Sequence, residues 1–381
     1  MIIFEPINYF NRLIMYNWQQ KDWPNFKYTT TEIEEKLFEF SQRAGRVNGI
    51  LEGLSDTMQM EAILSLMVAE AVKTSEIEGE YLSREDVMSS IRNNMGYGTP
   101  KAVKDPMARG VGDLMVRVRQ NFAEPLTDLK LFEWHRTLLS SAKRINTGQW
   151  RKHSEPMQIV SGSWGREKIH FEAPPSQLLP NEMQAFITWF NESHPEGANP
   201  IKKPLIRSAI AHLYFESIHP FEDGNGRIGR ALSEKALSQD LNRPILLSLS
   251  KAIEHDKQAY YKALKKAQQS NEITDWIIYF VNTVLEAQSQ AEELVSFTLR
   301  KARFFDRYRN SLNERQLKVV NRMLDEEPEG FKGGMTAKKY IALTKTSKAT
   351  ATRDLQDLAA KKLFIPIGEG RSTRYEINFE D

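Results

Sequence analysis

HPFEDGNGRIGR, residues 219–230, is the stretch from which we predict both the fold and the chemistry of the chain. Its Gly-Asn-Gly turn, residues 224–226, can point successive backbone N–H groups inward, and such a nest binds anions. The turn opens a helix, whose N-terminal dipole also favours negative charge. Arg227 and Arg230 lie three residues apart on that helix, so their guanidinium groups share nearly one face and can hold phosphate oxygens. The stretch therefore predicts a polyphosphate site.

Two side chains beside the turn supply reactive groups. Asp223 precedes the turn, where its carboxylate can hold Mg²⁺ against phosphates bound by the nest. His219 lies about one helical turn earlier, and histidine exchanges a proton near neutral pH, so it can accept the proton of an attacking hydroxyl. A lone histidine is more often structural, and a lone Asp-Gly-Asn-Gly segment is usually only a turn. Their joint occurrence within residues 219–230 instead predicts transfer of a phosphorus group to an alcohol.

The same residues resemble the signature of the Fic family, His-x-Phe-x-(Asp/Glu)-Gly-Asn-(Gly)-Arg-x-x-Arg, and satisfy every fixed position. The resemblance implies a protein adenylyltransferase that moves AMP from ATP-Mg²⁺ to a Ser, Thr or Tyr hydroxyl of a target protein and of itself. It implies that His219 is the general base, that Asp223 binds Mg²⁺ and that Phe221 anchors the loop in the core. The other implied nucleotide contacts of the signature are Gly224, Asn225, Gly226, Arg227, Ile228, Gly229 and Arg230.

The likeness extends over about residues 60–290. The strand pattern 157–162, with its return at 168–171, resembles the flap of Fic proteins, and residues 148–151 resemble the segment ahead of it. In relatives the flap edge aligns an extended segment of the target protein, which implies a target-binding edge over 157–171. Two tyrosines on a helix are, taken alone, more often core residues. The nucleotide contacts that the resemblance implies outside the signature are Val160, Ser161, Gly162, Tyr260 and Tyr261. The flap, with Trp164 and Arg166 in its tip, is longer than in some relatives, so the resemblance does not assign which tip residues touch target or nucleotide.

An acidic residue continues the buried stripe of a long predicted helix. Apolar residues recur at helical spacing over 60–72, and the same spacing leads to Thr74 and Glu78. A carboxylate on the inward face near a helix end needs a cationic partner. The segment up to Gly79 resembles the (Ser/Thr)-x-x-x-Glu-(Gly/Asn) inhibitory motif of class II Fic proteins. The resemblance implies that Glu78 pairs with Arg230 and obstructs productive ATP binding; the alternative is a solvated residue at a fraying helix end.

The C-terminal residues change character. Three short helical patterns over 311–361 and two strands around a Gly-rich tip predict a winged helix-turn-helix domain. Residues 338–381 contain nine Lys or Arg against six Asp or Glu, and the helix from Thr346 to Arg353 carries short hydroxyl and basic residues that suit phosphates and base edges. The predicted wing tip adds Arg371 and Arg374. These features fit DNA binding, and equally a protein-interaction or homodimer module.

Bulk properties set the frame for these motifs. The 381 residues exceed what one core usually holds, and 40% hydrophobic with 27% charged residues is ordinary for a globular protein. There is no cysteine, no secretory pattern at the N-terminus and no apolar run that could span a membrane, so we expect a cytoplasmic protein. The net charge of +2 predicts no general nucleic-acid affinity.

The motifs and patterns together predict a mainly α protein. We expect a Fic-type helical bundle with one β-hairpin flap, followed by a small α+β winged-helix domain. The expected parts are an N-terminal helical region (1–110) with the inhibitory helix at about 58–79, a catalytic core (111–300) and the winged helix (311–381).

The sequence leaves three functions open. The first is AMP transfer. The second is the reverse activity, in which Glu78 positions water to remove AMP from a modified protein. The third is a DNA-binding regulator that uses the pocket only to sense nucleotide, and His219 argues against it because a sensor needs the nest but no base.

Overall fold

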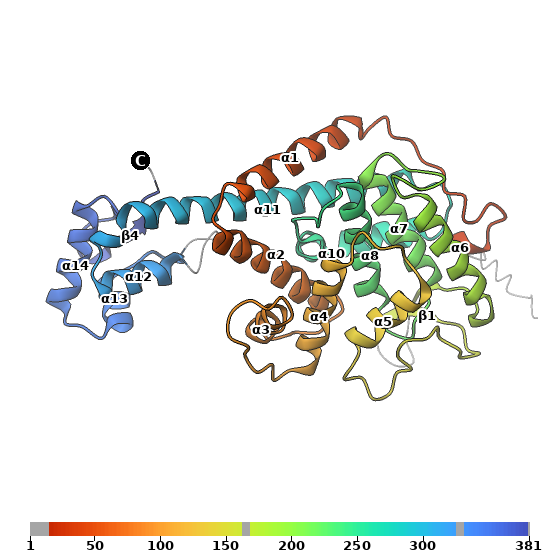
Figure 1. The fold of residues 1–381 in the computed structure, drawn as a ribbon, viewed down its shortest axis with the longest axis horizontal. Coiled ribbons are helices and arrows are strands. Elements are labelled where there is room, and N and C mark those ends of the chain that lie inside the picture. Colours follow the sequence, from red (N-terminus) through yellow and green to blue (C-terminus); the bar gives the residue numbers. More distant parts are fainter. Residues whose placement is uncertain (1–14, 162–167, 325–330, 380–381) are drawn as a thin grey trace, which may run out of the picture. The chain divides into compact units, whose positions relative to one another are not determined.

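The computed structural model describes residues 15–161, 168–324 and 331–379. These residues form two compact units. The first unit comprises Met1–Gln42 and Leu64–Gln288, and the second comprises Arg43–Ile63 and Ser289–Asp381. Three helices have residues in both units (Figure 1): α1 (Glu34–Glu52), α2 (Asp56–Ile77) and α11 (Thr274–Tyr308).

Helices dominate the first unit, as the sequence predicts. Besides the shared helices, they are α3 (Arg84–Asn94), α4 (Pro106–Gln120), α5 (Asp128–Leu138), α6 (Leu179–Glu192), α7 (Pro204–Ile218), α8 (Asn225–Asp240), α9 (Leu249–His255) and α10 (Lys257–Ala267). The sequence did not predict α3 and α9. A seven-residue helix such as α9 is too short to show a hydrophobic period, and its clearest signal is the N-cap Ser248, whose Oγ accepts a hydrogen bond from the backbone N–H of Lys251.

Helices α7 and α8 form the centre of the first unit. Every residue of α7 from Leu205 to Ile218 is buried, and α7 packs mainly against α8. The buried Arg207 guanidinium ties the helices together, because it donates to the Asp240 carboxylate at 3.1 Å and to the backbone carbonyl of Phe190 at 3.0 Å. A buried charge needs such a complete set of partners. These contacts fix the position from which the next loop starts.

The loop between α7 and α8 has a defined backbone. His219 ends α7 in the left-handed region at φ 51°, and Gly224 opens α8 at φ 80°. Arg151 is buried beneath this loop, where it donates from Nε to the His219 carbonyl at 2.9 Å and from Nη2 to the Pro174 carbonyl at 2.5 Å. Burial lowers the pKa of Arg151 to about 10. The segment ahead of the hairpin therefore helps to hold the signature loop in place.

The predicted hairpin is present. Strands β1 (Gln158–Ser161) and β2 (Lys168–Glu172) pair antiparallel, with Gln158 opposite Glu172 and a register shift between Ile159 and Val160. Among the described strands they form a sheet of two, so each has an outer edge without a strand partner. The flap-tip residues Gly162, Trp164 and Arg166 lie outside the described residues.

The second unit contains three further helices and a hairpin: α12 (Glu314–Leu324), α13 (Ala337–Thr344), α14 (Lys348–Ala360), β3 (Phe364–Ile367) and β4 (Arg374–Ile377). Its core gathers apolar residues from all of these elements. Asp354 is buried in it and accepts hydrogen bonds from Tyr340 Oη at 2.8 Å and Arg315 Nε at 2.9 Å. Met335 pairs with Tyr375 through backbone hydrogen bonds, which adds a short bridge beside β4. The winged-helix interpretation stays a hypothesis.

No helix among the described residues is long and apolar enough to cross a membrane.

Candidate active site

Hydrogen bonds close the signature loop upon itself. The Asn225 side chain accepts from the backbone N–H of Phe221 and donates to the Phe221 carbonyl, both at 2.9 Å. The Phe221 ring is fully buried and stacks on the His135 ring with centroids 4.0 Å apart. Phe221 thus lies in the core, as the sequence predicts. The Asn225 side chain holds the backbone of the turn that carries the N–H groups of the nest.

His135 is a buried partner of the loop that sequence reasoning missed. Its Nε2 lies 3.1 Å from the Asp223 carbonyl, and its Nδ1 accepts from the backbone N–H of Gly148 at 2.8 Å. Burial lowers the pKa of His135 to about 4, so the imidazole is neutral and donates from Nε2. This neutral histidine ties the signature loop to the segment ahead of the flap.

Asp223 presents a carboxylate at the mouth of the turn. Its side chain is 46% exposed and accepts from the backbone N–H of Gly224 at 2.6 Å, and Arg227 Nη2 lies 3.4 Å from it. No group of three Asp, Glu or His side chains among the described residues could hold a metal ion. A cation at Asp223 would therefore need further ligands from a bound phosphate or water.

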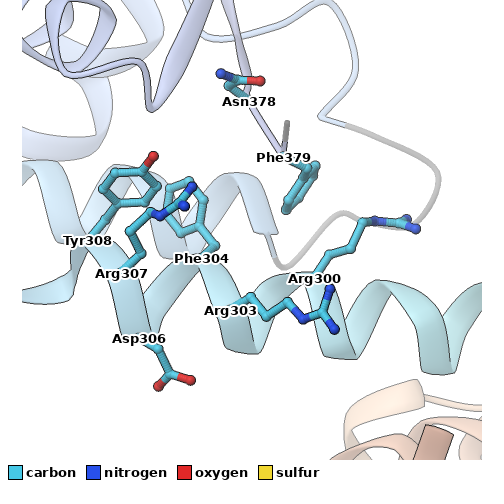
Figure 2. A pocket seen from close by; sticks show the side chains of 8 residues that line it. All are labelled: Arg300, Arg303, Phe304, Asp306, Arg307, Tyr308, Asn378 and Phe379. Carbon is cyan, nitrogen blue, oxygen red and sulfur yellow. The ribbon is translucent and has the colours of Figure 1, made fainter. Parts of the chain in front are cut away.

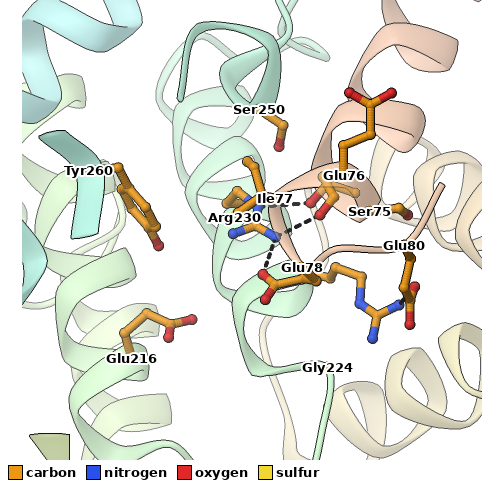
Figure 3. Close-up of polar contacts among 12 residues, drawn as sticks. Ser75, Glu76, Ile77, Glu78, Glu80, Glu216, Gly224, Arg230, Ser250 and Tyr260 are labelled. Atoms are coloured by element: carbon orange, nitrogen blue, oxygen red, sulfur yellow. Dashed lines mark hydrogen bonds and ion pairs between the residues drawn. The ribbon is translucent and has the colours of Figure 1, made fainter. Parts of the chain in front are cut away.

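Glu78 and Arg230 form the pair expected from the sequence (Figure 3). Arg230 Nη2 donates to Glu78 Oε1 at 2.7 Å and to the Thr74 carbonyl at 3.1 Å, while its Nε donates to Thr74 Oγ1 at 2.8 Å. Burial lowers the pKa of Arg230, but Glu78 outweighs this effect and the pKa is raised overall. Gly226 is needed here, because a Cβ at that position would collide with Glu78 Oε1. Gly79 completes the motif just beyond α2, at φ 84°.

A second glutamate from the same segment holds the other signature arginine. Glu80 Oε2 accepts from Arg227 Nη1 at 2.5 Å, and the arginine side chain is only 4% exposed. Burial raises the pKa of Glu80 although Arg227 opposes the shift. Sequence reasoning missed Glu80, because it lies beyond the end of α2 and therefore outside the helical stripe. Its acidity and its position two residues after Glu78 were the available signals.

One cavity of about 670 Å³ is lined by both Glu78 and the predicted base, His219. Its volume is typical of a small-molecule site. Tyr260 is buried, and its Oη lies 2.9 Å from His212 Nε2, whereas Tyr261 is 42% exposed and donates to the Ile77 carbonyl at 3.2 Å. The lining residues include Ile77, Glu78, Gly79, Ile159, His170, Phe171, Glu216, His219, Gly226, Tyr260 and Tyr261.

Not every predicted contact reaches this cavity. In the signature, His219 and Gly226 line it, whereas the other predicted contacts do not; these are Asp223, Gly224, Asn225, Arg227, Ile228, Gly229 and Arg230. Val160 and Ser161 lie in β1, where their backbones pair with Ile169 and Lys168, and nothing further is described of their side chains. Gly162 lies outside the described residues. The flap contributes Ile159, His170 and Phe171 instead.

The second unit has a basic cavity of about 450 Å³ along the last turns of α11 (Figure 2). Arg300, Arg303 and Arg307 project from this helix and are exposed, with Asp306 as the acidic group among them. The Arg300 guanidinium lies over the Phe379 ring at 5.7 Å. This cavity combines cationic groups with aromatic faces, a combination suited to anionic ligands.

Comparison with known proteins gives two family matches. Residues 125–237 match the Fic/DOC family, and residues 16–97 match a family described only as a domain of unknown function (DUF4172). The chain is 28% identical over 197 residues to the protein adenylyltransferase Fic of Drosophila virilis, which is 51% of this chain and 36% of that protein. It is 24% identical over 199 residues to that of Nematostella vectensis, 51% of this chain and 42% of that protein. The alignments therefore cover less than half the length of these relatives.

Solved structures show the same fold at low identity. A Fic family protein from Desulfovibrio desulfuricans G20 aligns with a TM-score of 0.51 and 18% identity over 94% of this chain and 99% of that chain. A Fic domain containing signaling protein from Bacteroides thetaiotaomicron aligns with a TM-score of 0.50 and 19% identity over 67% and 97%. These likenesses concern the fold alone. The complete signature lies inside the segment that matches the Fic/DOC family, residues 125–237.

Proposed function

We propose that the chain is a nucleotidyltransferase that moves AMP from ATP to a hydroxyl group of a protein side chain. The observation that carries this proposal is one cavity of about 670 Å³ that is lined by both His219 and Gly226 of the signature. The similarity to proteins named protein adenylyltransferase supports the same activity. His219 is what separates this function from simple nucleotide sensing, because a sensor needs no base.

The proposed roles of the site residues follow from their charged and polar groups. The nest at Gly224–Gly226, Arg227 and Arg230 would hold the phosphates, because backbone N–H groups and guanidinium forks bind phosphate oxygens. Asp223 fits a Mg²⁺ ligand, since its exposed carboxylate sits beside the nest; a bound Mg²⁺ would neutralise phosphate charge there. His219 would take the proton of the target hydroxyl, whose oxygen bonds to the α-phosphorus while the bond to the β-phosphate oxygen breaks and pyrophosphate leaves.

The contacts of Glu78 and Glu80 support autoinhibition. Both signature arginines already hold a carboxylate, so ATP must displace Glu78 from Arg230 and Glu80 from Arg227 before its phosphates can take those partners. Glu78 also lies against Gly226 in the nest. We infer that the segment Thr74–Glu80 keeps the activity low until it moves.

The flap suits an extended peptide of the target protein. Among the described strands, each strand of this two-stranded sheet has an outer edge without a strand partner, and such an edge can accept a peptide by strand addition. Phe171 and His170 of β2 line the cavity, so a peptide held on this hairpin would bring its hydroxyl residue near the site.

Labelled ATP tests the proposed activity directly. The full chain incubated with ATP and Mg²⁺ should retain label from α-labelled ATP and none from γ-labelled ATP, because AMP transfer keeps only the α-phosphate. Retention of γ-label would show phosphate transfer and overturn the proposal. Release of AMP from a pre-modified protein, without label uptake in any variant of Glu78, would favour the AMP-removing activity.

The second unit supports a separate candidate function, DNA binding. Lys348, Thr352 and Arg353 are exposed on α14, while Ala351 and Leu355 pack into the core. This leaves a basic and hydroxyl-bearing face available to a duplex. Fluorescence anisotropy with a labelled duplex tests it: the K348A/R353A variant should lose affinity, and K318A, at an exposed position on α12, should not. An equal loss of duplex affinity in both variants, or no duplex binding by either variant, would favour a protein-interaction or homodimer role.

A further inference from the structure

We propose that Glu216 is a positioning residue for His219. Its carboxylate faces Nδ1 of the imidazole, leaves Nε2 as the nitrogen that takes the hydroxyl proton, and stabilises the imidazolium that forms. The inference rests on the proposed function of His219 as the base. It gives the Glu216 carboxylate a role in catalysis. This role differs from that of Glu78 and Glu80, the glutamates that hold the arginines.

The last turn of α7 places the two side chains together. Glu216 lies three residues before His219, and residues at this spacing share a helix face. His219 then leaves the helix in the left-handed conformation, with φ 51°. Glu216 Oε2 lies 3.7 Å from His219 Nδ1, and the two side chains are 5% and 12% exposed. Both residues line the cavity.

Each of the two side chains has a buried atom without a hydrogen-bond partner among the described residues. These atoms are His219 Nδ1, which faces Glu216 Oε2, and the other carboxylate oxygen, Glu216 Oε1. A buried carboxylate oxygen without a partner is costly, so its retention calls for an explanation. A separation of 3.7 Å is too long for a hydrogen bond but within range of an ion pair. The attraction is therefore greatest when His219 carries the proton, which is the state that develops during transfer.

The surroundings keep Glu216 charged. Burial raises the pKa of Glu216, but His219, His212 and Arg230 lower it further than burial raises it. Gly229 on α8 provides the space, because a Cβ there would lie 2.6 Å from Glu216 Oε1. The titratable groups that act electrostatically on or with this carboxylate are His212 and His219 at α7, Arg230 on α8, and Tyr260 and Tyr261 on α10. Glu78 already pairs with Arg230, and burial lowers the pKa of His212, so among these groups His219 is the one that can become a cation beside Glu216.

The decisive variant is Glu216→Gln in the full chain, read by two measurements. Histidine ring NMR without ATP should show the titration midpoint of His219, assigned from its missing signal in H219A, falling by about one pH unit. The pH–rate profile of self-modification should lose at least about tenfold at its plateau, and its acid limb should move to lower pH. The matched control is Glu70→Gln, which removes a buried carboxylate bound to Ser248 and Ser250; it should leave the His219 midpoint unchanged.

A third variant separates charge from placement. Glu216→Asp keeps the negative charge but shortens its reach, so the His219 midpoint should stay near that of the wild type while the rate falls only partly. A lower rate in E216Q with an unmoved midpoint and acid limb would reduce Glu216 to a structural residue and overturn the inference, and so would an unchanged rate. Transfer retained by H219A would instead overturn the proposed function, so the two failures are distinguishable.

Discussion

Two regions of the candidate site, a phosphate side and a base side, differ in how their charges are paired. On the phosphate side, Arg230 and Arg227 each hold a glutamate from the segment after α2. On the base side, Glu216 and His219 face each other at 3.7 Å, with buried atoms that lack a partner among the described residues. The arginines of the phosphate side thus already have carboxylate partners that a ligand has to displace, although Arg230 Nη1 and Arg227 Nε have no hydrogen-bond partner in the described part of the chain. The base side becomes complete only when a proton arrives.

This difference suggests where control and catalysis reside. Removing one partner of a buried ion pair costs about 3–5 kcal/mol when nothing replaces it, and Arg230 is only 1% exposed. A triphosphate can replace the glutamates, so the segment competes with ATP for the same guanidinium groups. Changes on the phosphate side should therefore alter how often the site is productive, whereas changes on the base side should alter the chemical step.

The largest effect is expected on the base side, from His219→Ala. General bases contribute about 10²–10⁴-fold to rate, so transfer should fall to background, while ATP affinity should change by less than about tenfold (~1.4 kcal/mol) because the nest and arginines are intact. Radiolabel transfer and isothermal titration calorimetry measure the two quantities. Loss of affinity beyond tenfold with transfer retained would place His219 among the binding residues instead.

Opening the phosphate side by Glu78→Gly should act in the opposite direction. Freeing Arg230 lets it bind the γ-phosphate and align the α-phosphate for in-line attack, so self-modification should rise by at least about tenfold, a ~1.4 kcal/mol gain.

Two controls accompany this measurement. Glycine weakens a helix by up to about 1 kcal/mol, so Glu78→Gln should give the same rise without that effect. The double change Glu78→Gly with Arg230→Ala should fall back, because the gain passes through that arginine and the two effects cannot add. If neither single substitution raises the yield of AMP-modified protein, Glu78 is not an inhibitor.

Asp223→Ala tests the group at the edge of the phosphate side. The variant should need more Mg²⁺ for half-maximal activity, by about tenfold, because the metal is expected to bridge this carboxylate and the phosphates. A Mg²⁺ titration of self-modification in the Glu78→Gly background measures the shift. An unchanged titration curve at wild-type activity would leave Asp223 as a turn residue that caps Gly224.

Groups that belong to one continuous segment could be predicted from the sequence. The nest, the helix start and both arginines follow one another within residues 219–230, and helical spacing led from the stripe of α2 to Glu78. Apart from α3 and α9, the helices and the hairpin followed in the same way from hydrophobic period and turn residues.

The groups that were missed meet across segments or beyond a helix end. Glu80 follows the turn at Gly79, where no period applies, and its partner Arg227 is 147 residues away in the chain. Glu216 had a readable signal, an acidic residue in the largely apolar sequence of α7 and three residues before His219. Its importance depends on which side chains surround it, and that information requires the fold.

The smallest effect on the phosphate side should come from Glu80→Gln, and it measures how far the two glutamates share the inhibition. Glu80 is 26% exposed. Its partner Arg227 also has a second carboxylate nearby, because Asp223 lies 3.4 Å from the same guanidinium. Solvent-exposed pairs contribute about 0.2–1 kcal/mol, so self-modification should rise only about two- to threefold. If the glutamates act as one unit, the double variant Glu78→Gln with Glu80→Gln should self-modify about as fast as the faster single variant, because displacement of the segment frees both arginines at once. If they act independently, the gains should multiply. A fall in activity on Glu80→Gln would mean instead that Glu80 orients Arg227 for the phosphates, and the phosphate side would then hold one inhibitory glutamate rather than two.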